Sequence, residues 1–217
     1  MHGADESKLG LVPTTHYPAP SYQSTIPTIT MRLPYIPNPP TPATPTEAEI
    51  IAQTLARRGA EGLIPLDLTL LHSPPLTAGW NSFLGAIRTQ TSLPADIREL
   101  AICRVAVLHQ AHFEWTQHAP LARAAGVTRE GLRAVLDGTR GDLSERQIAV
   151  VEFATECVRE VRVGEGVFGR LREHFGDREV VEVVGTVAAY CCVAKFLVAL
   201  DVAEGNGVRV EDYVVPE

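Results

Sequence analysis

The sequence is poor in cysteine, with four residues in a chain of 217, and it contains no Cys-x-x-Cys pair. Secreted disulfide frameworks occur in much shorter chains with a higher share of cysteine. The first sixteen residues also lack the basic and apolar regions of a secretory signal. We therefore expect reduced thiols in a cytoplasmic protein.

Basic residues are also scarce: the chain has 19 Lys and Arg against 26 Asp and Glu, which gives a net charge of −7. This excess of acid argues against a nucleic-acid partner, which would need clustered Lys and Arg. The longest apolar stretch, residues 183–200, approaches the length of a membrane span but is interrupted by Thr186, Tyr190 and Lys195. It predicts a buried helix, and we expect no membrane partner.

Proline is concentrated at one end, with ten of the sixteen prolines in residues 1–46. Each proline removes a hydrogen-bond donor and restricts the residue before it, so this segment cannot be helical. The sequence predicts an extended arm over residues 1–45 and a folded domain over residues 46–217. Within the arm we expect a disordered leader over 1–28, and we expect 29–45 to lie on the body through Leu33, Tyr35 and Ile36.

From residue 46 onward the apolar residues recur with the helical period, and almost no alternating strand pattern is found. The predicted fold class is therefore all-α, with about eight helices. Capping boxes are expected at Thr46-x-x-Glu49 and Ser144-x-x-Gln147, and an apolar run over 63–71 leads into His72-Ser-Pro-Pro. The expected helices cover residues 47–58, 76–89, 94–109, 112–125, 128–138, 145–161, 165–175 and 178–201.

The expected helix 94–109 carries an acid on an otherwise apolar stripe. Glu99 shares this stripe with Ile102, Ala106 and His109 at helical spacing. Either the carboxylate is solvated near the positive end of the helix, or it is buried. Burial would raise its pKa and make it a candidate proton carrier.

The next expected helix carries Glu114 and His118 at positions i and i+4, so their side chains share a face that continues through Leu121, Ala122 and Ala125. An acid and an imidazole on an apolar face can transfer a proton near neutral pH. The alternative is a structural hydrogen bond or an exposed pair. Of the four nearby metal-ligand types, His109, His112, Glu114 and His118, only Glu114 and His118 converge, so we expect no metal.

Other side chains have both structural and functional interpretations. His72 could reach the pocket from its loop or be structural. Trp80 and Trp115 could line an apolar substrate pocket or serve in packing. Arg98 and Arg104 flank Glu99 and could pair with a carboxylate substrate or with surface acids.

The run LPADIRELAICRVAVLHQAHFEWTQHAPLARAAGV resembles the core of the carboxymuconolactone decarboxylase and alkylhydroperoxidase D-like (AhpD-like) superfamily. The runs LLHSPPLTAGWNSFLGAIRTQTSLP and FGRLREHFGDREVVEVVGTVAAYCCVAKFLVALDV resemble the rest of the same domain, so the resemblance covers roughly residues 60–205. It implies an AhpD-like helical domain that forms a homo-oligomer (a dimer, trimer or hexamer). The namesake decarboxylases of this superfamily act without a cofactor, and we expect none here.

The peroxidase branch of that superfamily carries Glu, then Cys-x-x-Cys, then His. On this chain the resemblance places the Glu at Glu99, the two cysteines at Ala111 and Glu114, and the His at His118. Thiol peroxidase chemistry needs an attacking and a resolving thiol, and both are missing here.

The groups that remain for chemistry are Glu99, Glu114 and His118. They predict an acid–base enzyme of the decarboxylase, isomerase or other lyase type that acts on a small organic acid or a polyketide-like molecule. Two alternatives stay open: a hydroperoxide reductase that uses Cys103 or a partner's thiol, and a non-catalytic oligomeric binding protein.

Overall fold

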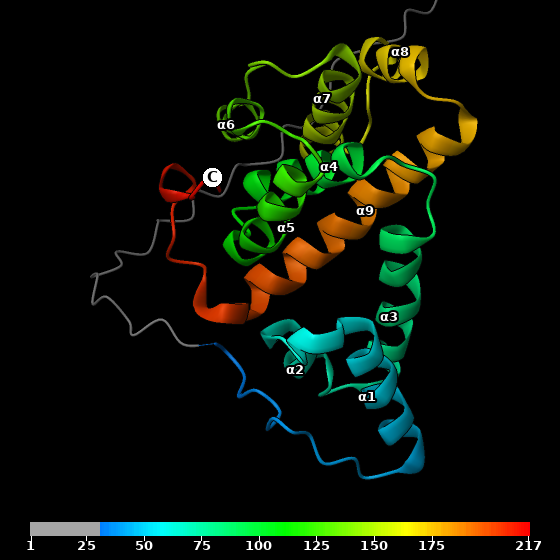
Figure 1. The fold of residues 1–217 in the computed structure, drawn as a ribbon, viewed down its shortest axis with the longest axis vertical. Helices are drawn as coiled ribbons and strands as arrows, with labels where there is room; N and C mark the ends of the chain where they lie inside the picture. The colour runs from blue at the N-terminus through cyan, green and yellow to red at the C-terminus, as the bar shows by residue number, and fades with distance from the viewer. Residues whose placement is uncertain (1–30) are drawn as a thin grey trace, which may run out of the picture.

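The computed structural model describes residues 31–217, so the expected leader over 1–28 lies outside the described residues. The described part is helical and contains no strand, which confirms the all-α fold class (Figure 1). Its α-helices are α1 (Pro45–Arg58), α2 (Pro65–Leu70), α3 (Pro74–Thr89), α4 (Ala95–Leu108), α5 (His112–Ala124), α6 (Arg129–Asp137), α7 (Glu145–Glu160), α8 (Glu165–His174) and α9 (Asp177–Leu200).

The helix boundaries agree closely with the periodicity, with one clear correction at the first helix. Thr44, not Thr46, caps α1: its hydroxyl accepts from the backbone N–H of Glu47, whose carboxylate accepts from the N–H of Ala43. The predicted capping box at Thr46 is therefore wrong, because Pro45 already begins the helix. The box at Ser144 and Gln147 is confirmed. The apolar run at 63–71 forms the short helix α2, which was not predicted as a helix.

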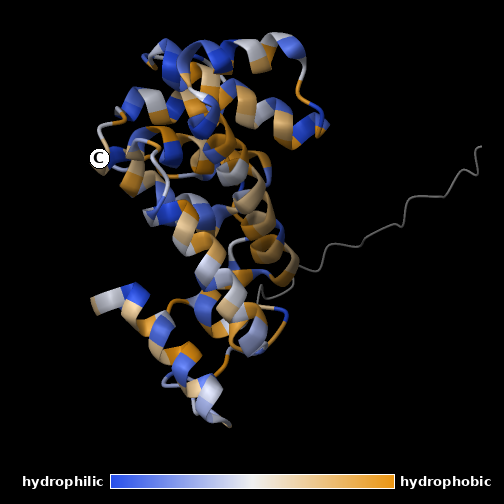
Figure 2. Ribbon diagram, turned by 90° about the vertical axis from the view of Figure 1, so that its right-hand side faces the viewer, coloured by the Kyte–Doolittle hydropathy of each residue, from blue (hydrophilic) through white to orange (hydrophobic). Residues whose placement is uncertain are grey.

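Helix α4 is the centre of the body. Apolar side chains surround it on all sides, and nearly every residue from Ile97 to Val107 is buried. It packs against α5, α6, α7 and α9. Blue and orange alternate along the outer helices, as expected for helices with one face in solvent (Figure 2). A side chain on α4 therefore lies in an apolar environment, and any charge there needs a partner.

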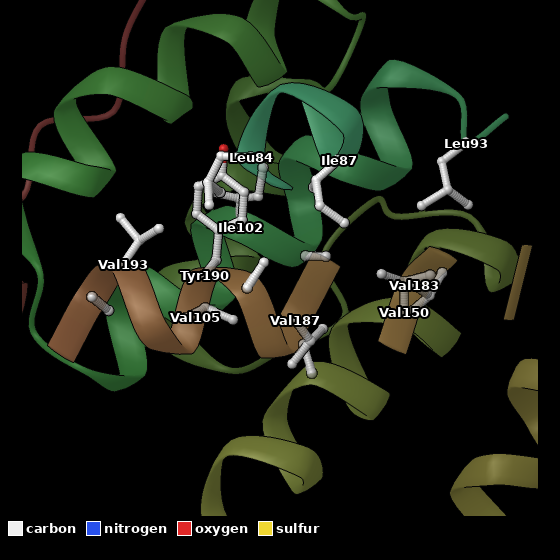
Figure 3. Close-up of a cluster of buried hydrophobic side chains, with 14 of the residues drawn as sticks. Leu84, Ile87, Leu93, Ile102, Val105, Val150, Val183, Val187, Tyr190 and Val193 are labelled. Atoms are coloured by element: carbon white, nitrogen blue, oxygen red, sulfur yellow. The ribbon is translucent and has the colours of Figure 1, made fainter. Parts of the chain in front are cut away.

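Helix α9 runs across the molecule between the α4–α8 group and the α1–α3 group (Figure 1). Among the described residues it alone is long and apolar enough to cross a membrane. Its inward side chains, including Val187 and Tyr190, pack in the core with Leu84 and Ile87 of α3 and Ile102 of α4 (Figure 3). The prediction of a buried core helix is confirmed for this inward face.

The part of the arm that the structure describes lies on the body, as expected. The backbone N–H of Ile36 donates to the carbonyl of Leu68, and the hydroxyl of Tyr35 accepts from the N–H of Ala203. Leu33 was expected to anchor this segment too, but its side chain is exposed. Backbone and phenol hydrogen bonds, more than leucine packing, hold the segment in place.

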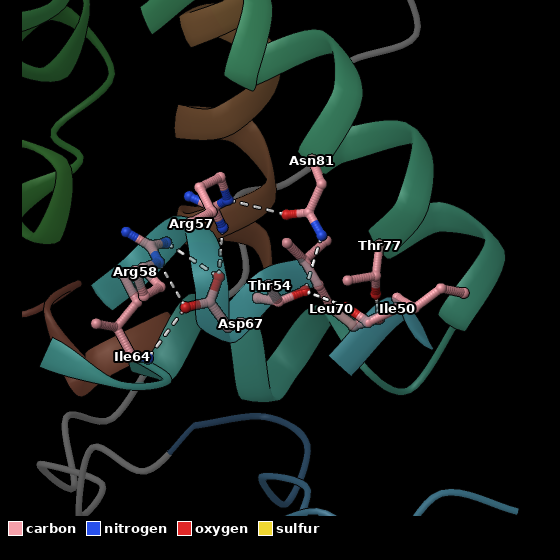
Figure 4. A network of polar contacts seen from close by, with 9 residues as sticks. All are labelled: Ile50, Thr54, Arg57, Arg58, Ile64, Asp67, Leu70, Thr77 and Asn81. Carbon is pink, nitrogen blue, oxygen red and sulfur yellow. Dashed lines mark hydrogen bonds and ion pairs between the residues drawn. The ribbon is translucent and has the colours of Figure 1, made fainter. Parts of the chain in front are cut away.

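A buried carboxylate joins α1 to α2 (Figure 4). Asp67 accepts from Arg57 at 3.0 Å, from Arg58 at 2.7 and 3.0 Å, and from the backbone N–H of Ile64 at 3.0 Å. Arg57 also donates to Asn81 of α3 at 3.1 Å. This network fixes both guanidinium groups at the end of α1, beside the cavities described below.

Replacement of Asp67 by Asn should destabilise the protein strongly. The change leaves two partly buried guanidinium groups without a countercharge, a loss that typically costs about 3–5 kcal/mol. The measurement is urea unfolding followed by circular dichroism. Asp177→Asn is the matched control, since Asp177 forms an exposed ion pair with Arg172, and it should cost less than about 1 kcal/mol. Equal, small losses in the two variants would contradict a structural role for Asp67.

Candidate active site

A cavity of about 150 Å³ lies where α1, α3, α5 and α9 meet. Apolar side chains from three helices form much of its wall, among them Trp80 and Leu84 of α3, Phe113 of α5 and Val193 of α9. Glu114, His118 and Tyr190 also line it. The lining by Trp80 agrees with the sequence-based expectation for this residue.

His118 and Glu99 form a buried hydrogen bond between α5 and α4. The imidazole Nδ1 lies 2.7 Å from Oε2 of Glu99, and Nε of Arg98 lies 3.2 Å from Oε1. Only 3 % of Glu99 is exposed, so its carboxylate is buried and not solvated at the helix start. Burial alone would raise the pKa of Glu99, but the hydrogen bond from His118 and the charges of His118, Arg98 and Arg88 lower it. The expected rise is therefore wrong, and Glu99 is an ionised carboxylate.

His118 is held as a neutral imidazole. Burial lowers its pKa, and the adjacent Glu99 only partly opposes this effect. A neutral ring that donates its Nδ1 proton to Glu99 keeps Nε2 as a lone-pair acceptor. The edge of the His118 ring packs against Tyr190, with the ring centroids 5.0 Å apart. The carboxylate and the aromatic ring thus fix both the tautomer and the orientation of the imidazole.

Glu114 is the most unusual group in the cavity wall. Only 2 % of the residue is exposed, and neither carboxyl oxygen has a hydrogen-bond partner among residues 31–217. Burial raises the pKa of Glu114 well above its ordinary value. An unpartnered carboxyl group in an apolar environment stays protonated at neutral pH. Glu114 is therefore a neutral carboxylic acid that lines a cavity.

The predicted pairing of Glu114 with His118 is not formed. The two residues lie one turn apart on α5, as their spacing requires, but the hydrogen-bonding carboxylate of His118 is Glu99 on α4. The spacing rule finds neighbours on one helix, whereas this pairing depends on how two helices pack. Both residues still line the same cavity.

Two other predicted site residues lie elsewhere. His72 is exposed, and its Nε2 lies 2.7 Å from the carbonyl oxygen of Pro34, so it contacts the arm and not the cavity. Trp115 is almost fully buried in a second core cluster, where its indole N–H donates to the carbonyl of Val214 at 2.9 Å. It follows Glu114 directly on α5 and so faces a different side of the helix. Neither residue lines the cavity.

The thiols are not placed for peroxide chemistry. Cys103 is fully buried, and burial, followed by the charge of Glu99, raises its pKa well above the ordinary value. A thiol held in its protonated form inside a core is a poor nucleophile. No cysteine lines the cavity.

The histidines near Glu114 diverge. His109 is within hydrogen-bond distance of the carbonyl of Val105, and His112 packs against Tyr213. Within residues 31–217 no three His, Cys, Asp or Glu side chains gather into a metal-binding group.

Sequence reasoning missed most of the cavity wall, including the three arginines Arg57, Arg58 and Arg88 and the phenol of Tyr190. A signal was present for Arg88, because Trp80, Leu84 and Arg88 recur every four residues and so share one face of α3. Arg57 and Arg58 lie in the last turn of a helix, where basic side chains commonly interact with the helix dipole. This structural explanation gave no reason to expect them beside a cavity. Arg104, by contrast, is buried away from this cavity and donates to Thr155 and to the carbonyl of Val135.

Residues 74–156 match the model of the carboxymuconolactone decarboxylase family. This segment runs from the start of α3 into α7 and contains Glu99, Glu114 and His118. No curated protein matches the chain in sequence.

Several solved structures share the fold. An uncharacterized peroxidase-related protein with an alkylhydroperoxidase AhpD core from Ralstonia eutropha JMP134 has a TM-score of 0.64 at 20 % identity, over 75 % of this chain and 90 % of that one. An uncharacterized peroxidase-related protein from Silicibacter sp. TM1040 has a TM-score of 0.65 at 14 % identity, over 83 % of this chain and 95 % of that one.

A third similar structure is that of the debrominase Bmp8, solved as a cysteine-to-alanine variant in complex with 2,3,4-tribromopyrrole. Its TM-score is 0.62 at 15 % identity, over 75 % of this chain and 89 % of that one. The fold of these neighbours is the helical AhpD-like fold, and the family model covers α3 and α5, which carry part of the cavity wall. Part of the chain, residues 74–156, therefore matches the carboxymuconolactone decarboxylase family model, and the chain shares the helical AhpD-like fold of these structures.

Proposed function

We propose that this protein is a cofactor-free acid–base enzyme of the decarboxylase, isomerase or other lyase type, which acts on a small organic acid. One observation carries the proposal: a neutral, unpartnered carboxylic acid, Glu114, and a neutral imidazole, His118, line one small apolar cavity. Acid–base catalysis needs such a pair of groups, with one proton available and one lone pair free.

The roles follow from the protonation states. Nε2 of His118 removes a proton from the substrate, and Glu99 stabilises the imidazolium that forms and keeps the ring oriented. Glu114 donates its proton to the enolate-like carbon. The proton abstraction by His118 belongs to an isomerisation, after which the imidazolium returns its proton through water to Glu114. In a decarboxylation His118 takes no proton: the bond to the carboxylate breaks, CO₂ leaves, and Glu114 protonates the carbanion that remains. Glu114 then regains a proton from water, so the cycle consumes one proton and no oxidant.

Hydroperoxide reduction remains the second candidate, because two of the structural neighbours are peroxidase-related proteins. The burial and raised pKa of Cys103 argue against it, as do Ala111 and Glu114 at the positions where the resemblance places the two thiols. Cys103→Ser separates the two functions: it should abolish a hydroperoxide reductase activity that uses Cys103 and spare acid–base catalysis.

Proton exchange gives a test that does not need the natural substrate. An enzyme with this pair should exchange the acidic C–H protons of small β-keto and lactone acids in D₂O, or release CO₂ from them, and ¹H NMR follows both reactions. Glu114→Gln and His118→Ala should each lower the exchange rate by about a hundredfold to ten-thousandfold, because each removes one proton-transfer group. Glu99→Gln should have a smaller effect, since the amide oxygen still accepts from Nδ1.

Glu130→Gln, an exposed residue on α6, is the matched control and should exchange at the wild-type rate. Thermal melts followed by circular dichroism establish that each variant folds. If Glu114→Gln and His118→Ala fold and exchange as fast as the wild type, the catalytic roles are wrong. If no acid in the panel reacts but several bind, the result favours a non-catalytic binding protein.

The rate should depend on pH with a bell-shaped profile. It should fall on the acidic side below the ordinary histidine value of 6.5, because the lowered pKa of His118 keeps the base neutral down to that region. It should fall on the alkaline side as Glu114 ionises above its raised pKa. The measurement is kcat/KM against pH for any substrate that the panel identifies, and a profile that rises continuously with pH would contradict the role of Glu114.

The protonated state of Glu114 also predicts how stability depends on pH. In the unfolded chain this group ionises near 4.5, whereas in the folded protein it stays protonated at higher pH. Folding then takes up one proton, so the free energy of unfolding should fall by about 1.4 kcal/mol per pH unit between the two pKa values. Below pH 4.5 both states are protonated and this loss disappears.

Glu114→Gln has no such proton to take up. The difference in urea stability between this variant and the wild type should therefore shift in favour of the variant as pH rises from about 5 to about 8, by about 1.4 kcal/mol per unit while Glu114 remains protonated. Glu130→Gln again serves as the control and should show no such trend. A wild-type-to-variant difference that is constant across this range would show that Glu114 is not held in its neutral form.

A further inference from the structure

A second, larger cavity adjoins the one that holds Glu114. Its volume is about 480 Å³, and it shares with the first cavity a wall that includes Arg57, Arg58, Arg88 and Leu121. Glu99 lines this second cavity, whereas Glu114 and His118 line the first. We call them the outer and the inner chamber. The two chambers meet at a wall that carries three cations.

Arg88 differs from the other cations of these chambers because no acid contacts it, although its charge helps to lower the pKa of Glu99 from a distance. Asp67 binds both Arg57 and Arg58, and Arg98 of the outer chamber donates to Glu99. Within residues 31–217, Arg88 has neither a hydrogen bond nor an ion pair to another side chain. Glu61, the remaining acid of the shared wall, is exposed and has no ion pair in the same part of the chain. A partly buried guanidinium group that makes no direct contact with an acid keeps its hydrogen-bond donors available for an anion.

The position of Arg88 orients what it would bind. Trp80, Leu84 and Arg88 lie on one face of α3, one turn apart, and all three line the inner chamber. A ligand whose anionic group binds Arg88 would therefore place its apolar part along α3, against Leu84 and Trp80. This direction leads into the chamber where Glu114 and His118 lie.

We propose that Arg88 binds the carboxylate of the substrate at the junction of the two chambers, and that the substrate is a carboxylate with a compact apolar body that fills the inner chamber. The inference rests on the proposed function, since it names the substrate class of the same site. A planar guanidinium group matches a carboxylate with two parallel hydrogen bonds. The small volume of the inner chamber limits the apolar part of the substrate to a small ring or a short chain.

Binding of benzoate and of its neutral analogue benzamide tests this proposal without any turnover. Isothermal titration at fixed ionic strength should show that benzoate binds the wild type more tightly than benzamide does. Arg88→Gln should weaken benzoate binding by about tenfold to a hundredfold and leave benzamide binding unchanged, because only the charge-assisted hydrogen bonds are lost. Arg88→Lys, which keeps the charge but not the planar fork, should give an intermediate affinity.

Arg133→Gln makes the same change in charge at an exposed residue of α6 that lines neither chamber, and it should bind both probes as the wild type does. Equal benzoate affinity in the wild type and in a folded Arg88→Gln variant would overturn the proposal. So would the absence of benzoate binding to the wild type at about 10 mM. The test is independent of the catalytic proposal: benzoate binding that depends on Arg88, together with proton exchange that does not depend on Glu114, would reject only the catalytic roles.

Discussion

The hydrogen bond between His118 and Glu99 is the interaction on which the rest of the site depends. It joins α5 to the central helix α4 inside an apolar body, where each of the two groups alone would be costly to bury. It also determines what its neighbour can be. Because the Nδ1 position of His118 is occupied from α4, the imidazole does not use Glu114 as its partner, and Glu114 is left in the cavity wall as a free acid. The contrast between one ionised and one neutral carboxyl group therefore originates in the packing of two helices.

The two carboxyl groups illustrate how environment separates the pKa values of identical side chains. Glu99 is buried, but a hydrogen-bonded imidazole and two guanidinium groups keep its pKa low. Glu114 is buried to a similar extent without any such partner, and its pKa is raised. The unpartnered acid works against stability at neutral pH, since folding must keep it protonated. The same property is the one that a general acid requires, so a buried group that costs stability is also the proposed proton donor.

The sequence predicted the fold well, because helical periodicity and helix caps are local signals. The limits of α4, α5 and α7 lie within one or two residues of the expected ranges, and the cap at Ser144 was found from its spacing alone. The site was only partly predictable. Periodicity along α5 found Glu114 and His118 on a common face, but the partner of His118 is on another helix, 19 residues earlier. For the same reason Trp115, which looked like a pocket residue, belongs to a different core.

The position of Glu114 links the proposed chemistry to the thiol motif of the peroxidase branch that the sequence resembles. The resemblance places one cysteine at Ala111, which is now part of the buried core, and the other at Glu114, which lines the cavity. A carboxylic acid at the second position cannot resolve a sulfenic acid, but it retains a transferable proton beside the same imidazole. The buried Glu99–His118 pair would serve either chemistry, because an oriented neutral imidazole can activate a thiol or take a proton from carbon. Under the proposed function, a carboxyl group in place of a thiol, with its oxygens kept free of partners, supplies the transferable proton of an acid–base site on this helical frame.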